Sequence, residues 1–141
     1  MKKAEATRHN ILLHAFELIY ANGYNNTSID DILATTNVTK GAFYYHFRNK
    51  DEMGLAIINE ILKPSLDSSF AGPLEKKDNP VEAVYTMIKQ LLTNEDFMKV
   101  EFGCPVSNLT QETAASNDVF ADALENLTSQ WRDLLVEKIN K

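Results

Sequence analysis

The chain has a single cysteine, no long apolar run and no signal-like start, and each absence excludes a class of protein. Cys104 alone can form neither an internal disulfide nor a metal site built on cysteines. No apolar run approaches the roughly 20 residues that a membrane span requires. The basic N-terminus, Met-Lys-Lys-Ala-Glu-Ala-Thr-Arg, continues as an amphipathic stretch, unlike a secretory signal. We therefore expect a cytoplasmic protein that does not associate with a membrane.

The residue patterns of common enzyme sites are also missing. His9 and His14 are five residues apart on one expected helix, so their side chains diverge instead of converging on a metal, and His46 is the third histidine. The sequence contains no nucleophile elbow, no zinc-binding helix motif and no glycine-rich phosphate loop. We expect no catalytic residues, no metal and no cofactor, and hence not an enzyme.

The net charge of -6 conceals a difference between the two parts of the chain. Residues 1–50 carry six basic and four acidic side chains, a balance of +2, whereas residues 51–141 carry eight basic and sixteen acidic ones, a balance of -8. A mildly basic segment on an acidic remainder suits local binding of phosphates by an otherwise soluble protein. Many unrelated proteins show such halves, so the pattern is weak by itself.

Capping signals and apolar spacing divide residues 1–50 into three expected helices. Apolar residues at steps of three and four form one stripe on a first helix, which ends at Asn22-Gly23. Thr27-Ser28, with an acidic residue following, predicts the start of a second, short helix, and Thr39 can cap a third. Two short helices joined by a tight turn predict a helix-turn-helix unit over residues 28–47.

The remaining residues, 51–141, predict a helical body. Asn49 caps a fourth helix, which we expect Pro64 to kink or end, and residues 71–80 have the composition of a linker. Further helix starts follow at Asn79-Pro80, at Gly103-Cys104-Pro105 and at Asn117-Asp118. No segment alternates convincingly as a strand does. We therefore predict an all-α protein with a three-helix head, residues 1–50, and a helical body, residues 51–141.

The head carries three motifs with specific spacing. They are Arg8-x-x-Ile11-Leu12-x-x-Ala15-x-x-Leu18-Ile19, Gly23-Tyr24-x-x-Thr27-Ser28-Ile29-x-x-Ile32, and Val38-Thr39-Lys40-Gly41-Ala42-Phe43-Tyr44-Tyr45-His46-Phe47-x-Asn49-Lys50. Together they resemble the DNA-binding head of the TetR family of one-component transcriptional regulators. Spacing, turn glycine and aromatic order agree over about a third of the chain. The body resembles the family in its helix pattern and in the segment from Gly103 to Leu109, which recurs in a subset of these regulators.

This resemblance implies a homodimer that represses a promoter by binding operator DNA until a small-molecule inducer binds the body. Family members generally continue with two further helices that build the dimer interface, whereas this sequence stops at Lys141. The resemblance therefore implies either a fragment or an unusual dimer interface. An alternative function is a truncated interaction module that heterodimerises with a full-length regulator and modulates it.

The third expected helix supplies most of the candidate DNA contacts. Lys40 can donate to guanine edges or phosphate, Gly41 lets the helix backbone approach the duplex, and Tyr44 shares a face with Lys40. Hydroxyls beside helix starts favour phosphate, although capping alone explains them equally well. The complete set of candidate DNA-binding residues is Thr27, Ser28, Thr39, Lys40, Gly41, Tyr44, Tyr45, His46 and Lys50.

Aromatic and flexible apolar residues in the body are candidates for lining an effector cavity, although ordinary core packing explains such residues as well. The candidates are Tyr85, Ile88, Leu92, Phe97, Met98, Phe102, Cys104, Phe120, Leu127 and Trp131. Exposed amides at a helix start can activate the thiol of Cys104 as a sensor of electrophiles or oxidants. The competing interpretation is an inert, buried cysteine.

Overall fold

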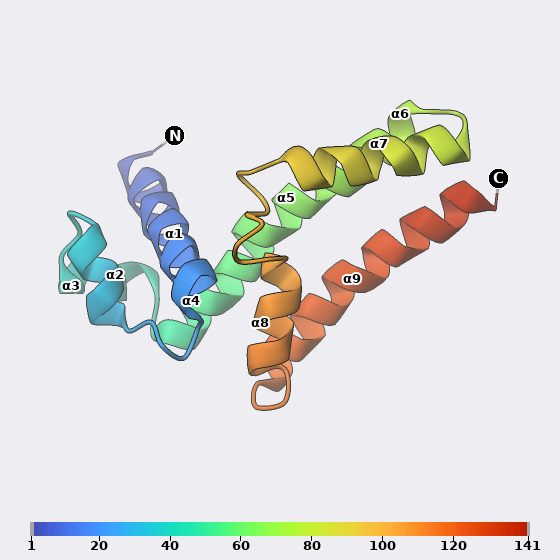
Figure 1. Ribbon diagram of the computed structural model, residues 1–141. Helices are drawn as coiled ribbons and strands as arrows, with labels where there is room; N and C mark the ends of the chain where they lie inside the picture. The colour runs from blue at the N-terminus through green and yellow to red at the C-terminus, as the bar shows by residue number, and fades with distance from the viewer. Residues whose placement is uncertain (1, 141) are drawn as a thin grey trace.

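A computed structural model describes residues 2–140, and this part of the chain is mostly helical (Figure 1). The elements are α1 (Lys3–Asn22), α2 (Ile29–Thr35), α3 (Lys40–His46), α4 (Lys50–Ile57), the π-helical η1 (Ile58–Leu62), α5 (Lys63–Leu66), the π-helical η2 (Asp67–Ala71), α6 (Gly72–Lys76), α7 (Pro80–Thr93), α8 (Pro105–Thr113) and α9 (Asp118–Ile139). The only β-type pairing among these residues is an isolated bridge between Lys99 and Gly103. The all-α prediction is confirmed.

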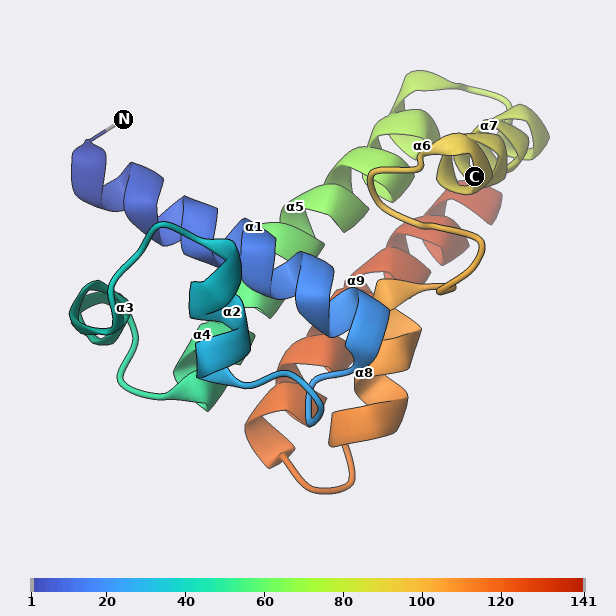
Figure 2. The ribbon, with the colours of Figure 1, turned by 60° about the vertical axis from the view of Figure 1, so that its left-hand side comes forward.

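The helices form a small head at one end of the molecule and an elongated body that extends away from it. Figures 1 and 2 show α1, α2 and α3 gathered at the head, while the segments from α4 to α6 follow one another as a long rod. Along this rod, α9 contacts α4, η1, α5, η2 and α6, and α7 packs on α6. The short α8 contacts both α9 and α1, so it joins the head to the body.

Side-chain caps start five of the helices where the sequence predicted helix starts. Ser28, Thr39, Asn49 and Asn117 each accept a hydrogen bond from the backbone N–H three residues further on. At the start of α7, Asn79 accepts from the N–H groups two and three residues further on. These bonds satisfy amides that have no partner within the helix. Because the interactions are local in sequence, they predict the helix starts without knowledge of the fold.

The helix that was expected to kink or end at Pro64 does not end there, because the helical rod continues through this proline. The π-helical turn η1 immediately precedes this proline, and the backbone N–H of Lys63 donates to the carbonyl of Ile58, five residues back. In a regular α-helix a proline clashes with the carbonyl four residues back and cannot donate a hydrogen bond to it. A widened turn moves that carbonyl away and so accommodates the proline. The linker expected over residues 71–80 is likewise mostly helical, since α6 ends at Lys76.

One apolar core connects the head and the body. The larger buried cluster includes Ile11 and Phe43 of the head together with Phe120 and Leu124 of α9. Gly54 brings α4 against α9 so closely that an added Cβ would lie 2.4 Å from Cζ of Phe120. Packing is therefore continuous across the boundary at residue 50 that separates the two predicted parts.

A second, smaller cluster fills the far end of the body. It consists of Phe70, Leu74, Ala83 and Met87, and Trp131 packs against it with its ring centroid 4.9 Å from that of Phe70. The segments η2, α6, α7 and α9 thus each contribute apolar side chains to this cluster. A search of residues 2–140 finds no helix with the length and apolar character needed to cross a membrane.

Candidate nucleic-acid interface

The helix α3 is fixed by two buried phenylalanines and presents two tyrosines to solvent. Phe43 and Phe47 are completely or almost completely buried in the larger core. Their ring centroids lie 5.5 Å apart. Tyr44 and Tyr45 are 46% and 79% exposed. Because two exposed tyrosines lie together beside the exposed Lys40, and tyrosine is enriched at interfaces, the outward edge of α3 is a candidate contact surface.

The start of α3 is open and carries a cation. A Cβ built on Gly41 would meet no atom within 4 Å, so internal packing does not require glycine at this position. Lys40 is exposed, and its ammonium lies 3.7 Å from a carboxylate oxygen of the equally exposed Asp30. An ion pair between exposed side chains contributes little, so Lys40 can exchange this partner for another anion. The hydroxyl of Thr39 accepts a hydrogen bond from the N–H of Ala42, as a cap does.

Two of the residues predicted to contact DNA are turned into the head. Thr27 is 2% exposed, and its hydroxyl donates to the carbonyl of Gly23 at 2.8 Å. The ammonium of Lys50 donates to the carbonyl of Tyr24 at 2.5 Å and lies over the ring of that tyrosine. Both residues are thus engaged in holding the turn between α1 and α2 instead of facing outward.

Ser28 remains at the surface, but its polar groups serve the start of α2. Its hydroxyl accepts from the N–H of Asp31, and its own N–H donates to the carboxylate of Asp31. The pKa of Asp31 lies below its ordinary value, mainly because the backbone of Ser28 bonds to its carboxylate and, to a smaller extent, because the side chain of Ser28 does so too. This reciprocal arrangement is a capping box, so capping accounts for Ser28 without any partner.

Polar groups gather around the buried Tyr24 behind the helix-turn-helix. Its hydroxyl donates a short hydrogen bond to Asp51, and burial, followed by this bond, raises the pKa of Tyr24. Burial also lowers the pKa of Lys50, an effect that the nearby Asp51 opposes. The carboxylate of Glu112 in α8 accepts from the backbone N–H groups of Tyr24, at 2.7 Å, and of Asn25, at 2.9 Å. A body residue therefore holds the loop that leads into α2.

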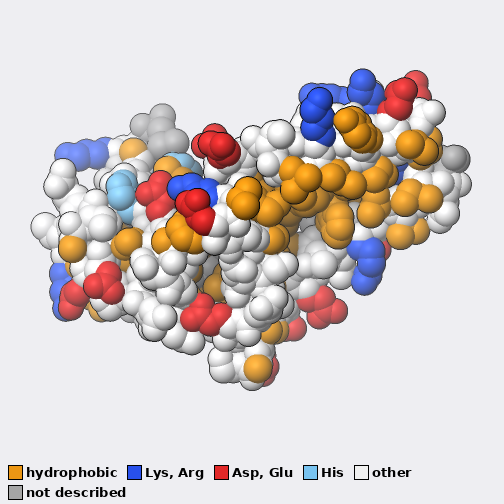
Figure 3. Space-filling model, in the orientation of Figure 1, with side chains coloured by type: hydrophobic (Ala, Val, Ile, Leu, Met, Phe, Trp, Pro, Cys, Tyr) orange, Lys and Arg blue, Asp and Glu red, His pale blue; other side chains and the backbone are white. Residues whose placement is uncertain are grey.

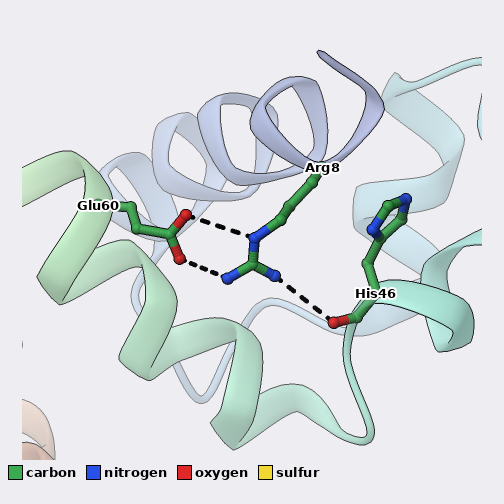
Figure 4. Close-up of polar contacts among 3 residues, drawn as sticks. All are labelled: Arg8, His46 and Glu60. Carbon is green, nitrogen blue, oxygen red and sulfur yellow. Dashed lines mark hydrogen bonds and ion pairs between the residues drawn. The ribbon is translucent and has the colours of Figure 1, made fainter. Parts of the chain in front are cut away.

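His46 lies at the end of α3, where its backbone carbonyl takes part in a second link between head and body. Figure 4 shows the guanidinium of Arg8, from α1, placed between Glu60 of η1 and the carbonyl oxygen of His46. Arg8 donates two bonds to the carboxylate of Glu60 and one, at 3.5 Å, to His46. The same guanidinium lies 4.6 Å from the ring centroid of Phe47. One arginine thus couples the end of α3 to the helical rod.

The structure adds surface residues that the sequence patterns did not single out. Lys3 and Asn37 line a groove beside Thr39, between the start of α1 and the turn before α3. Arg48 is exposed just after α3, with its guanidinium 3.5 Å from Glu52. Nothing but charge distinguished these basic residues in the sequence, and only the fold places them next to α3.

The ten candidate effector-lining residues are not brought around one cavity. Phe120 and Leu127 are buried in the larger core, against which Cys104 also packs, and Trp131 belongs to the smaller cluster. Met98 is only partly buried. Phe97 and Phe102 do line a common cavity, which is formed with α1 and is described below.

The remaining three candidates lie on the outer face of α7. Tyr85, Ile88 and Leu92 are 66%, 46% and 66% exposed, and Val81 continues the same stripe at 78%. Figure 3 shows hydrophobic side chains gathered over the end of the molecule that contains α5, α6 and α7. In this structure these residues therefore form an apolar surface instead of lining a pocket.

A helix-turn-helix with an exposed second helix, joined to a separate helical body, defines the class of helix-turn-helix regulators. Comparison with known proteins places the chain within that class. Residues 11–57 match the profile described as "Bacterial regulatory proteins, tetR family", and residues 80–141 match "Transcriptional regulator LmrA/YxaF-like, C-terminal domain". The first match contains most of α1 and all of α2, α3 and α4.

Similar proteins agree with both matches. An uncharacterized HTH-type transcriptional regulator in the lacX 3'region of Lactococcus lactis subsp. lactis is 34% identical over 134 residues, covering 95% of this chain and 68% of that protein. The HTH-type transcriptional regulator LmrA of Bacillus subtilis (strain 168) is 26% identical, covering 96% and 72%. The crystal structure of regulatory protein TetR from Rhodobacter sphaeroides is 30% identical, with a TM-score of 0.71, covering 92% and 71%.

The chain therefore belongs to the TetR family of transcriptional regulators. The family resemblance of the head and the predicted fold class are confirmed, and the protein is a regulator of transcription and not an enzyme.

Proposed function

We propose that the protein is a cytoplasmic TetR-type repressor that binds operator DNA through α2 and α3 as a homodimer and leaves it when a small molecule binds the body. Residues 1–50 act as the DNA-binding part, and residues 51–141 act in effector binding and dimerisation. The observation that carries the proposal is the outward edge of α3, where Lys40, Tyr44 and Tyr45 are exposed above two buried phenylalanines.

The proposed contacts divide into base-reading and phosphate-binding groups. A major groove admits one α-helix, and Lys40 and Tyr44, four residues apart, face the same way from α3. The open Gly41 allows the backbone between them to approach the bases. In this proposal the phosphates are bound, and the register is set, by Tyr45 and Arg48 together with Thr39, Lys3 and Asn37 along the adjacent groove. Thr27 and Lys50 are left out of this set because their polar groups are bonded inside the head.

A dimer is required because one α3 reads only a few base pairs. Two such helices in a symmetric dimer bind half-sites about 34 Å apart, one turn of the duplex. Any effector must therefore act by changing the position of α3 in each subunit. The Arg8 bridge to Glu60 and the Glu112 bonds to the loop at Tyr24 are the contacts that can carry a movement of the body to α3.

The test is a comparison of variants on operator DNA identified by genomic footprinting of the bound protein. Lys40→Ala and Tyr44→Ala are expected to weaken binding by about 1–3 kcal/mol each, if each removes a base contact. Lys89→Ala and Lys76→Ala are the controls, because both lysines are exposed in the body, away from the head, and neither belongs to the candidate effector-lining residues. Affinity is measured by fluorescence anisotropy with labelled duplex at fixed salt.

The controls are expected to bind operator DNA as tightly as the unaltered protein. If Lys40→Ala and Tyr44→Ala also retain full affinity, the proposed docking of α3 is wrong. A strictly monomeric mass in solution, even with operator DNA present, contradicts the homodimer.

A further inference from the structure

A cavity of about 660 Å³ lies between the head and the body, outside the contacts proposed for DNA. One wall is the second half of α1, another is the junction of η1 and α5, and the third is the non-helical segment 94–103 that precedes α8. The volume lies within the range of about 300–1,000 Å³ that is usual for small-molecule sites. A ligand held here would contact both parts of the protein at once.

Aromatic rings form a continuous wall of this cavity. The rings of Phe16 and Tyr20 stack with centroids 5.6 Å apart and planes 15° from parallel, and Phe102 meets Tyr20 edge-on at 5.3 Å. Phe97, which is 4% exposed, also lines the cavity. Stacked and edge-on rings of this kind offer flat faces that bind both apolar groups and cations.

The aromatic wall is held in place by the hydroxyl of Tyr20. This hydroxyl accepts a hydrogen bond from the backbone N–H of Lys99 at 2.8 Å and donates a short one to the carbonyl of Gly103. The segment 94–103 is thereby tied to α1 across the cavity. The site is therefore already assembled before any ligand enters, which lowers the entropic cost of binding.

The charges around the cavity are mostly of one sign. Glu17, Glu95, Asp96 and Glu101 contribute carboxylates to its lining, against the single ammonium of Lys99. The ion pairs found within residues 2–140 include none of these four carboxylates. An aromatic wall with a net negative rim disfavours anions and favours a ligand that is both apolar and positively charged.

We propose that this cavity binds an aromatic organic cation, whose rings pack against Phe16, Tyr20 and Phe102 while its charge faces the carboxylate rim. Binding of such a cation is a property of the isolated protein. Only its consequence for transcription rests on the proposed function, in which a ligand that contacts both α1 and segment 94–103 favours one position of the head relative to the body.

Equilibrium dialysis measures how tightly the DNA-free protein binds thioflavin T, an aromatic cation, and its neutral N-demethylated analogue. We expect thioflavin T to bind at least tenfold more tightly than the neutral analogue. At about 6 Å in a water-like dielectric, one unit charge changes the affinity for a cation about threefold. Glu17→Gln and Glu101→Gln are each expected to weaken binding about threefold and together about tenfold.

Two further variants separate a local effect from a general one. Lys99→Gln removes the opposing charge and is expected to strengthen cation binding about threefold. Glu125→Gln makes the same change in net charge as the cavity variants at an exposed position of α9 that does not line the cavity, and it is expected to leave binding unchanged. All of these positions are exposed, so the variants are expected to fold, which circular dichroism checks.

Three results would each overturn the proposal. The first is that thioflavin T does not bind at concentrations up to about 1 mM, which would mean a very weak affinity. The second is that the neutral analogue binds equally well, and the third is that the cavity variants behave like Glu125→Gln. A cation that binds as expected without changing operator affinity leaves the cavity assignment intact and contradicts only its regulatory consequence. The two proposals can therefore fail separately.

Discussion

The close contact between Gly54 in α4 and Phe120 in α9 predicts that replacing this glycine with alanine destabilises the protein. In most helix interiors the same change is stabilising by about 1 kcal/mol, because alanine has the higher helix propensity. Here the new Cβ would lie 2.4 Å from Cζ of Phe120 and 3.0 Å from Cε2 of Tyr24, and both rings are buried. The helices must separate by roughly 1 Å to restore ordinary contact distances.

Overpacking of a filled core typically costs about 1–3 kcal/mol. We take the upper end because Phe120 is only 1% exposed and cannot rotate into solvent. After subtracting the gain in helix propensity, Gly54→Ala is expected to lower the free energy of unfolding by about 2 kcal/mol. For a chain of this length, this change corresponds to a fall in Tm of the order of 8 °C.

Gly41→Ala is the matched control for this prediction. Gly41 lies within α3 and is followed by Ala42, and a Cβ there would meet nothing within 4 Å beyond its chain neighbours. This variant is expected to be more stable than the unaltered protein by up to about 1 kcal/mol. Urea denaturation followed by circular dichroism measures both variants under the same conditions.

A double-mutant cycle identifies the cause of the effect. Phe120→Leu removes the atom that clashes, so Gly54→Ala is expected to cost less in that background, with a coupling energy of about 1–2 kcal/mol. If Gly54→Ala is as stable as the unaltered protein, or equally destabilising in both backgrounds, the steric reasoning is refuted.

Three further predictions concern the head. Glu112→Ala is expected to destabilise the protein by about 1–3 kcal/mol, because the amides of Tyr24 and Asn25 lose a charged acceptor, and Glu112→Gln, which keeps one oxygen, is expected to cost about half as much. Urea denaturation measures both variants, and stability equal to that of the unaltered protein in both contradicts the role of this contact. The folded state raises the pKa of Tyr24 above its ordinary value of 10.0, so the stability that its hydroxyl contributes is complete below about pH 10 and declines as the pH rises further. Urea denaturation between about pH 8 and 11 should show this loss and Tyr24→Phe should reduce it, whereas an unchanged loss in that variant refutes the assignment. Gly41→Ala is expected to maintain or slightly increase stability, since the added Cβ meets no protein atom, but to weaken operator binding about tenfold because the methyl group holds α3 away from the bases. Full operator affinity in this variant means that close approach at this position is not required.

Local interactions explain why the head was predictable in detail. Ser28 and Thr39 cap their helices through bonds that span three residues, and Gly23 ends α1 with a positive φ of 95°. These signals involve neighbouring residues only, so the sequence predicts them without the fold. The alternation of buried Phe43 and exposed Tyr44 on α3 follows in the same way from helical spacing.

Part of the candidate interface depended instead on contacts between distant residues. Lys50 was predicted to bind phosphate, but its ammonium is held by the carbonyl of Tyr24, 26 residues earlier in the chain. Thr27 is covered by the packed head in a similar way. A basic or hydroxyl side chain shows no sign in the sequence of whether it faces solvent or a buried carbonyl.

What the sequence alone determined is most of the helices and their starts, the family of the head and the outward face of α3, because caps and periodicity act over one or two turns. Tertiary structure alone decided that the rod passes through Pro64, that the apolar stripe of α7 faces outward, and that Phe97 and Phe102 meet α1 around a cavity. It also placed Arg8 between Glu60 and the end of α3. Each of these features depends on which helix packs against which. The packing of the helices minimises the exposed apolar area of the whole chain, so no single segment determines it.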